Sequence, residues 1–120
     1  LLAENVTVCL GQDDVSDAYY PYGRINMLEV AFLAAHLLWM TTGREIETLY
    51  DMITTHAAQA MNVENHSLQV GNSANLVVLD TSSILEALRE HAAPKHVIMN
   101  GNIIDPVKMK AVADSGTWSP

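Results

Sequence analysis

Apolar residues at the start of the chain follow first a strand-like and then a helical spacing. Val6, Val8 and Leu10 occupy alternate positions with small residues between them, which is typical of a short strand buried on both faces. From about residue 25 to residue 40, apolar side chains recur at i, i+3 and i+4 and occupy nearly every face of the predicted helix. The pattern therefore predicts a buried strand and then a helix that is covered on several sides.

A second helix is predicted directly afterwards. Thr42 and Glu45 form the Thr-x-x-Glu pattern of a capping box, which marks a helix start. One apolar stripe then continues to about Met61. Two successive helices with a short connection predict a helical hairpin.

The second half of the chain opens with a polar stretch, residues 62–75, which predicts a loop. Residues 76–79 read Leu-Val-Val-Leu and predict a short buried strand. Ser83 and Glu86 repeat the capping-box pattern and open a short helix that reaches about His91.

The strongest local signal is Asn100-Gly101 between two apolar runs, residues 96–99 and 102–104. Both turn residues tolerate the positive φ angles of a type I′ turn, whose twist matches that of the flanking strands. The sequence therefore predicts a β-hairpin. The tail after Pro106 shows no clear pattern.

Composition and charge limit the classes of partner. Hydrophobic residues make up 49% of the 120 positions, which is enough for one modest core and is not the composition of a disordered chain. The formal net charge is −8, and the six Lys and Arg residues are scattered. Binding to nucleic acid or to an anionic membrane surface is therefore not expected.

Cysteine usage and targeting signals predict a cytoplasmic protein. Cys9 is the single cysteine, which excludes an internal disulfide and a multi-cysteine zinc site, and its place in the predicted strand indicates a buried residue. No signal peptide is visible, and the longest apolar stretch, which contains His36, is too short to span a membrane. His36 itself is expected to be a hydrogen-bonded core residue. The chain opens at Leu1 in the approach to a strand, so a fragment is expected.

The candidate chemistry follows the first predicted strand directly, as Gly11-Gln12-Asp13-Asp14. In α/β barrels, polar side chains at the C-terminal ends of strands carry out catalysis, because the strand holds them rigidly and the loop leaves room for substrate. A carboxylate there can bind a divalent metal or take a proton from metal-bound water. The alternative is that Asp13 or Asp14 caps a turn.

An aromatic run at residues 19–22 follows the carboxylates. Its tyrosines can stack on a flat heterocycle or pack within the loop, and the spacing leaves both interpretations open. The five histidines include no HxH or HExxH pair, so none of them is predicted to be a metal ligand.

Three segments resemble bacterial cytosine deaminases, and they occur in the same order. Residues 5–28, with Gly-Gln-Asp-Asp and Tyr-Pro-Tyr-Gly, resemble the last barrel strand and the loop after it. Residues 52–58 resemble the helix that carries Ile-Thr-His-His-Ser-Ala in that family, and residues 71–79 resemble its Gly-Asn-Ser-Ala-Asn-Leu segment. Many other amidohydrolases have Ala-Asp-Leu in place of Ala74-Asn75-Leu76, which favours the cytosine deaminase branch. The resemblance extends over roughly residues 5–105.

The resemblance implies an α/β fold in which this chain is the C-terminal fragment of a metal-dependent hydrolase (β/α)₈ barrel. Residues 1–61 would supply the last barrel strand, the active-site loop and the following helices. Residues 62–120 would supply the C-terminal part of a small β-sandwich domain, with a short helix and a hairpin. Because a complete barrel takes about 250 residues, the chain alone is expected to have an α+β architecture.

The resemblance also implies roles for three residues. Asp13 matches the carboxylate that approaches one divalent metal, iron or zinc, and shuttles a proton as water attacks the amidine carbon and ammonia leaves. Asp14 and Tyr19 match groups near the substrate. Gln12 stands where the family commonly has His, and Arg24 also departs from the family pattern. The main metal ligands would lie upstream, so the chain alone is expected to bind no metal, since such sites need about three protein ligands.

The sequence therefore predicts a fragment of a metal-dependent amidohydrolase that deaminates cytosine or a related amino-heterocycle and is inactive alone. Two alternatives remain open. One is an amidohydrolase that acts on a triazine or another cyclic amidine, and the other is a stand-alone, non-catalytic α+β module. A small heterocyclic substrate is the expected partner of the complete enzyme. The apolar helix would lack its neighbours in a fragment, so a homo-oligomer is also expected.

Overall fold

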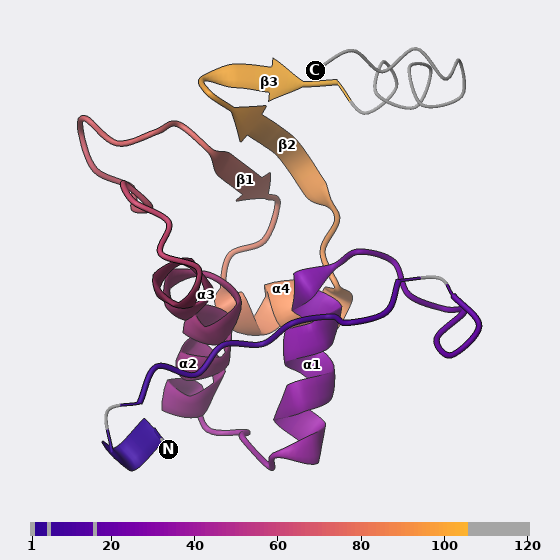
Figure 1. Cartoon of the computed structure of the whole chain (residues 1–120). Helices are drawn as coiled ribbons and strands as arrows, with labels where there is room; N and C mark the ends of the chain where they lie inside the picture. Colours follow the sequence, from indigo (N-terminus) through magenta and orange to yellow (C-terminus); the bar gives the residue numbers. More distant parts are fainter. Residues whose placement is uncertain (1, 5, 16, 106–120) are drawn as a thin grey trace.

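The computed structural model describes residues 2–4, 6–15 and 17–105. The predicted second unit, residues 62–120, thus lies partly outside the described residues. Helices and strands are segregated in space, with the helices below and a small sheet above in Figure 1. This segregation is the α+β architecture expected for the chain by itself. The elements are the 3₁₀ helix Leu2–Glu4, α1 Met27–Leu37, α2 Gly43–Ile53, α3 Thr55–Ala60, β1 Leu76–Leu79, α4 Ile84–Glu90, β2 Pro94–Met99 and β3 Asn102–Ile104.

Helix α1 is shorter than the apolar pattern predicted, for reasons visible at both of its ends. Asn26 is the N-cap, and its side-chain oxygen accepts a hydrogen bond of 3.0 Å from the backbone N–H of Leu28. The helix ends at Leu37, because Leu38 is the C-cap and Trp39 has a left-handed φ of 56°. The predicted extension to residue 40 is therefore a turn.

Helix α2 begins as predicted, but the second helical segment is divided in two. Thr42 and Glu45 form the complete capping box, in which each side chain bonds the other's backbone N–H. The helix then breaks at Thr54, whose φ and ψ of −128° and −91° are not helical. The Thr54 hydroxyl donates a 2.7 Å hydrogen bond to the backbone oxygen of Tyr50, a side-chain contact that competes with helix geometry.

The core lies between three helices. Leu49 is fully buried on α2, and α4 packs against both α1 and α2. Ser83 caps α4 by accepting a hydrogen bond from the Glu86 backbone N–H, which is one half of the predicted capping box, while the Glu86 side chain accepts hydrogen bonds from Ser82. Although α4 follows β1 in sequence, it therefore joins the helical layer, and the division at residue 61 stays a prediction. The core residues are Leu28, Ala31, Ala34, Leu49, Met52, Ala87 and Leu88.

The sheet contains β1, β2 and β3 in that order, all antiparallel. The predicted hairpin is confirmed, since Asn100 and Gly101 have φ values of 50° and 79° between β2 and β3. Asn75 connects β1 to this turn, because its side-chain oxygen accepts a 2.8 Å hydrogen bond from the Asn100 backbone N–H. Leu79 packs against the helical core and so joins the two layers.

The predicted first strand has no strand partner among the described residues and forms neither helix nor strand. Val8 and Leu10 pack against the core, whereas Cys9 points away from it and is exposed. The prediction of a strand buried on both faces is therefore wrong for this chain. Side chains in this segment still alternate between two faces, but only the face that carries Val8 and Leu10 is covered by the core.

Helix α1 also exposes more apolar surface than the pattern predicted. Leu37 is 79% exposed, and Trp39 just after the helix is 85% exposed. His36 is exposed rather than in the core, although its ring is hydrogen-bonded to the Phe32 backbone oxygen at 2.8 Å.

None of the helices in the described ranges combines the length and apolar character that a bilayer-spanning segment requires.

Candidate active site

The segment that carries the candidate carboxylates is fixed to the helical layer just before it. The backbone N–H of Leu10 donates a 3.0 Å hydrogen bond to the backbone oxygen of Met52 in α2. A ring nitrogen of His56 in α3 lies 3.2 Å from the backbone oxygen of Val8. These two contacts hold the chain up to Leu10, so the residues that follow emerge from a fixed point. His56 therefore contacts backbone and has a structural role here.

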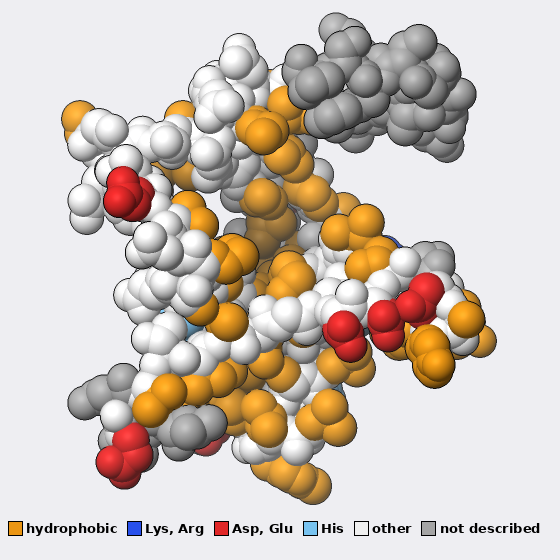
Figure 2. Space-filling view, in the orientation of Figure 1, with side chains coloured by type: hydrophobic (Ala, Val, Ile, Leu, Met, Phe, Trp, Pro, Cys, Tyr) orange, Lys and Arg blue, Asp and Glu red, His pale blue; other side chains and the backbone are white. Residues whose placement is uncertain are grey.

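A cavity of about 400 Å³ opens between this segment and α1. Figure 2 shows carboxylate side chains in a row along the loop at the right, beside hydrophobic side chains. The volume lies within the range of about 300–1,000 Å³ that is usual for small-molecule sites. The polar residues that line the cavity are Gln12, Asp13, Asp14, Tyr20 and Glu29, and the apolar lining includes Leu10, Val30, Leu33, Ala34 and Leu37.

Asp13 is held at this cavity by an unusual backbone. Its φ is 63°, in the left-handed region that few residues other than glycine adopt, although Asp and Asn tolerate it best. The side chain is exposed and makes no hydrogen bond with any described residue. The described residues thus show no hydrogen bond by which the Asp13 side chain would cap the turn. A strained backbone that presents a carboxylate to a cavity is a feature found at functional sites.

Asp14 and Asp17 form a carboxyl pair beside Asp13. The backbone N–H groups of Tyr20 and Tyr19 each donate a 2.8 Å hydrogen bond to Asp17 Oδ1, and Tyr20 has the larger effect in lowering the pKa of Asp17. The side-chain hydrogen bond between Asp14 and Asp17, followed by desolvation and the Asp13 charge, raises the pKa of Asp14. The two carboxyl groups thus have pKa values that are shifted in opposite directions.

The structure separates the two neighbouring tyrosines. Tyr19 is 90% exposed and does not line the cavity, so its predicted substrate contact stays a prediction. Tyr20 lines the cavity instead, and its hydroxyl lies 3.5 Å from Glu29 Oε1 at the start of α1. The sequence interpretation singled out neither Tyr20 nor Glu29. The signal available for Tyr20 was only its place in the aromatic run.

Gln12 contributes a polar atom without a partner. Its side-chain oxygen Oε1 is buried and has no hydrogen-bond donor within the described part of the chain. Most buried side-chain oxygens in folded proteins accept at least one hydrogen bond, so an unpaired one calls for an explanation. Gln12 lines the same cavity as Asp13 and Asp14.

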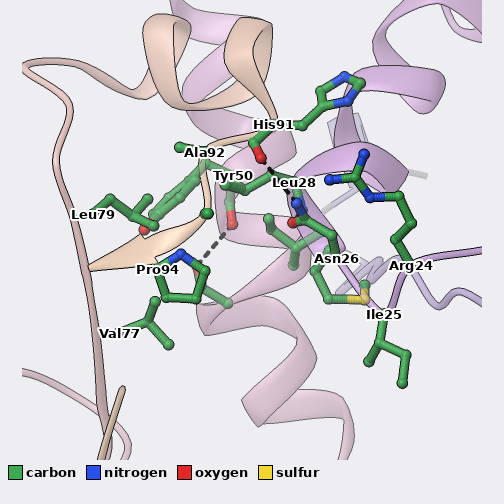
Figure 3. Close-up of a pocket in the computed structure, with 14 residues that line it drawn as sticks. Arg24, Ile25, Asn26, Leu28, Tyr50, Val77, Leu79, His91, Ala92 and Pro94 are labelled. Carbon is green, nitrogen blue, oxygen red and sulfur yellow. Dashed lines mark hydrogen bonds between the residues drawn. The ribbon is translucent and has the colours of Figure 1, made fainter. Parts of the chain in front are cut away.

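A second cavity, of about 480 Å³, lies between the start of α1, α2 and the sheet. Figure 3 shows the Asn26 side chain donating to the backbone oxygen of His91, while the His91 ring points away from the other labelled side chains. Arg24 lies at its edge, and none of the residues that line it is an Asp or Glu. Despite its larger volume, this cavity lacks the carboxylates on which the predicted chemistry depends.

The residues described do not make a complete metal centre. Across residues 2–4, 6–15 and 17–105, no three His, Cys, Asp or Glu side chains converge in a group that could hold a metal ion. A catalytic metal of the implied kind needs about three protein ligands. Asp13 could supply one of them, and the residues present do not fit the rest.

Comparison with known proteins settles the family. The model of the amidohydrolase family matches residues 1–105, which is most of the chain and includes the whole candidate site. The chain belongs to the amidohydrolase family. This confirms the family predicted from the three sequence segments.

Relatives of this amidohydrolase chain act on two kinds of heterocycle. N-isopropylammelide isopropyl amidohydrolase from Pseudomonas sp. strain ADP is 31% identical over 105 residues, which cover 87% of this chain and 26% of that protein. The structure of 5-methylcytosine deaminase from Klebsiella pneumoniae with phosphonocytosine matches with a TM-score of 0.80 and 30% identity, over 88% of this chain and 26% of that one. N-isopropylammelide isopropylaminohydrolase from Burkholderia multivorans matches with a TM-score of 0.81 and 31% identity, over 86% and 26%. The chain thus spans about a quarter of the length of the relatives it matches.

Proposed function

We propose that this amidohydrolase chain forms part of an enzyme that hydrolyses the exocyclic C–N bond of an amino-substituted heterocycle. One observation carries the proposal: directly after the anchored segment that ends at Leu10, Asp13 presents to the cavity a carboxylate that bonds no described residue. The family match and the two kinds of relative support the same reaction class. In this proposal residues 1–61 contain the segment that takes the place of the last strand of a (β/α)₈ barrel, and residues 62–120 form part of a small β-domain.

The proposed chemistry of Asp13 is proton transfer. As a water oxygen attacks the ring carbon that bears the amino group, the Asp13 carboxylate accepts the proton that the water loses. Asp13 then gives that proton to the departing nitrogen, and ammonia or an alkylamine leaves as the C–N bond breaks. The carboxylate ends the cycle unprotonated. Asp14 and Tyr19 are proposed to contact the heterocycle.

A divalent metal, iron or zinc, is proposed for the complete enzyme, with Asp13 as one ligand. The other ligands would come from outside this chain, because its described residues contain no group of three. We accordingly propose that the 120-residue chain alone holds no catalytic metal and has no activity.

Two substrate classes fit the proposal, and the relatives support both. One is a cytosine-like pyrimidine, as in the deaminase from Klebsiella pneumoniae, and the other is an N-alkylated triazine, as in the two isopropylammelide enzymes. They differ in the group that leaves, which is ammonia in the first class and isopropylamine in the second.

A chimeric enzyme tests this proposal. Residues 1–105 would replace the matching quarter of the 5-methylcytosine deaminase from Klebsiella pneumoniae, and release of ammonia or isopropylamine would be measured with cytosine, 5-methylcytosine and N-isopropylammelide. We expect turnover of at least one substrate, and its loss in the Asp13→Asn chimera. A chimera that is folded by thermal melting and loaded with metal, yet inactive on all three substrates, would contradict the proposal.

A further inference from the structure

The turn that follows the candidate carboxylates is held by one side chain. Asp17 Oδ1 accepts hydrogen bonds of 2.8 Å from the backbone N–H groups of Tyr19 and Tyr20. An Asp side chain that bonds the backbone a few residues ahead replaces a backbone turn and fixes the direction of the residues it spans. Asp17 itself is exposed and does not line the Asp13 cavity. Its contacts are therefore those of a residue that acts through its neighbours.

Tyr20 carries the effect of this turn to the cavity. It is half-buried and lines the cavity, whereas Tyr19 is 90% exposed and does not. The Tyr20 hydroxyl lies 3.5 Å from Glu29 Oε1 in α1. Because the cavity lies between the Asp13 loop and α1, this contact joins its two sides. The separation of the two sides thus depends on where Tyr20 is held.

We infer that Asp17 is a positioning residue for the proposed reaction: its side-chain oxygen holds Tyr20 toward α1 and thereby sets the width of the cavity that receives the heterocycle. The inference rests on the proposed function and deepens it, because it assigns the residue that shapes the site around Asp13. Asp17 touches no substrate and transfers no proton. Loss of its acceptor should therefore weaken substrate binding, which raises KM, and should change kcat less.

Three substitutions of Asp17 separate the acceptor from the charge. Asp17→Asn keeps a side-chain oxygen at the same distance from the backbone and removes the charge. Asp17→Gln places the same amide one methylene further out, and Asp17→Ala has no acceptor. The Asn variant should keep the turn, while the Gln and Ala variants should both lose it. Since these two variants differ in size, one of them suffices if the other does not fold.

The position of Tyr20 is measured in the 120-residue chain. NMR would follow hydrogen exchange at the Tyr19 and Tyr20 amides and the nuclear Overhauser contacts between the Tyr20 ring and the Glu29 side chain. Asp17→Ala and Asp17→Gln should speed exchange at both amides by about threefold to tenfold, as expected for one net hydrogen bond. Both variants should also weaken the ring contacts, and Asp17→Asn should retain them.

The use of that position is measured in the chimeric enzyme, with the substrate that it turns over fastest. Asp17→Ala and Asp17→Gln should raise KM by about threefold to tenfold, and Asp17→Asn should recover most of the loss. A double-mutant cycle with Tyr20→Ala then tests the route, because a residue that acts through the Tyr20 ring has little effect once that ring is removed. In the Tyr20→Ala background, Asp17→Ala should change KM by less than about twofold.

Three outcomes would overturn the inference. These are an unmoved Tyr20 ring in a folded Asp17→Ala or Asp17→Gln chain, an unchanged KM in the corresponding active chimera, and an undiminished effect of Asp17→Ala in the Tyr20→Ala background. An inactive wild-type chimera would instead reject the proposed function and, with it, the role of Asp17 in the reaction. The NMR measurement would still show separately whether Asp17 holds Tyr20 in place.

Discussion

Replacing Asp13 by Gly, Asn and Ala separates the cost of its backbone from the use of its carboxylate. With a φ of 63°, Asp13 lies in a region that costs an L-residue roughly 1–2 kcal/mol relative to glycine. The extra conformational freedom of glycine in the unfolded state destabilises the folded chain by about 0.5–1 kcal/mol. Asp13→Gly should therefore stabilise the chain by roughly 0–1.5 kcal/mol. Asp13→Asn should be nearly neutral, since Asn tolerates this conformation, and Asp13→Ala should be the least stable of the three.

The two readouts should move in opposite directions for the glycine variant. Chemical denaturation of the 120-residue chain measures the free energy of unfolding, and the chimeric enzyme measures turnover. Loss of proton transfer by a carboxylate lowers the rate by about 10²–10⁴-fold, so Asp13→Gly and Asp13→Asn should both be nearly inactive. A variant that is at least as stable as the wild type and yet inactive would show that the strained backbone is retained for function.

Two results would refute this reasoning. If Asp13→Gly lowered the free energy of unfolding by more than about 1 kcal/mol, the Asp13 side chain would have a structural role, as the turn-capping alternative holds. If the Asp13→Asn chimera kept near-normal turnover, the proton would be carried by another group, and Asp14 would be the next residue to replace.

Four further predictions concern stability, specificity and association. The hydrogen bonds from Thr42 lower the pKa of Glu45. The stability that these bonds contribute should therefore be complete above the ordinary pKa of 4.5 and should be lost as the pH falls through the lower folded-state pKa. Glu45→Gln should remove this pH dependence from denaturation curves. Leu49→Ala, at a fully buried site, should cost about 2–5 kcal/mol of unfolding free energy, whereas Leu85→Ala, 46% exposed, should cost clearly less. Tyr19→Ala in the chimera should change the kcat/KM ratio between cytosine and N-isopropylammelide more than the metal content, and an equal loss for both substrates would contradict the proposed contact. Analytical ultracentrifugation of the 120-residue chain should detect dimers or larger species, and a stable monomer would reject the prediction of a homo-oligomer.

Local chemistry was sufficient to predict several elements from the sequence. The caps Thr42 and Ser83 and the turn Asn100-Gly101 each depend on residues within a few positions of one another, and the structure confirms all three. The N-cap Asn26 depends on equally local chemistry, since its side chain bonds the N–H two residues on. It could have been recognised as a polar residue directly before an apolar helix.

The candidate site was only partly predictable, because it depends on contacts between distant residues. The strand-end motif located Asp13 and Asp14, and both line the cavity. That Tyr20 rather than Tyr19 faces Glu29 depends on the turn that Asp17 fixes through two backbone hydrogen bonds. No hydrophobic pattern encodes which of two adjacent aromatic residues turns inward.

The errors about burial share one physical cause. A hydrophobic pattern shows which side chains would gain from burial, but a second surface must be present to cover them. Cys9 and Trp39 satisfied the pattern and are nevertheless exposed. The sheet shows the same mismatch, since Val77 and Ile103 are 60% and 66% exposed although strands so apolar usually have both faces covered. Relatives in which this region makes up about a quarter of the chain have further segments available to cover such faces. The exposed faces thus support the proposal that the site around Asp13 is completed by surfaces from outside these 120 residues.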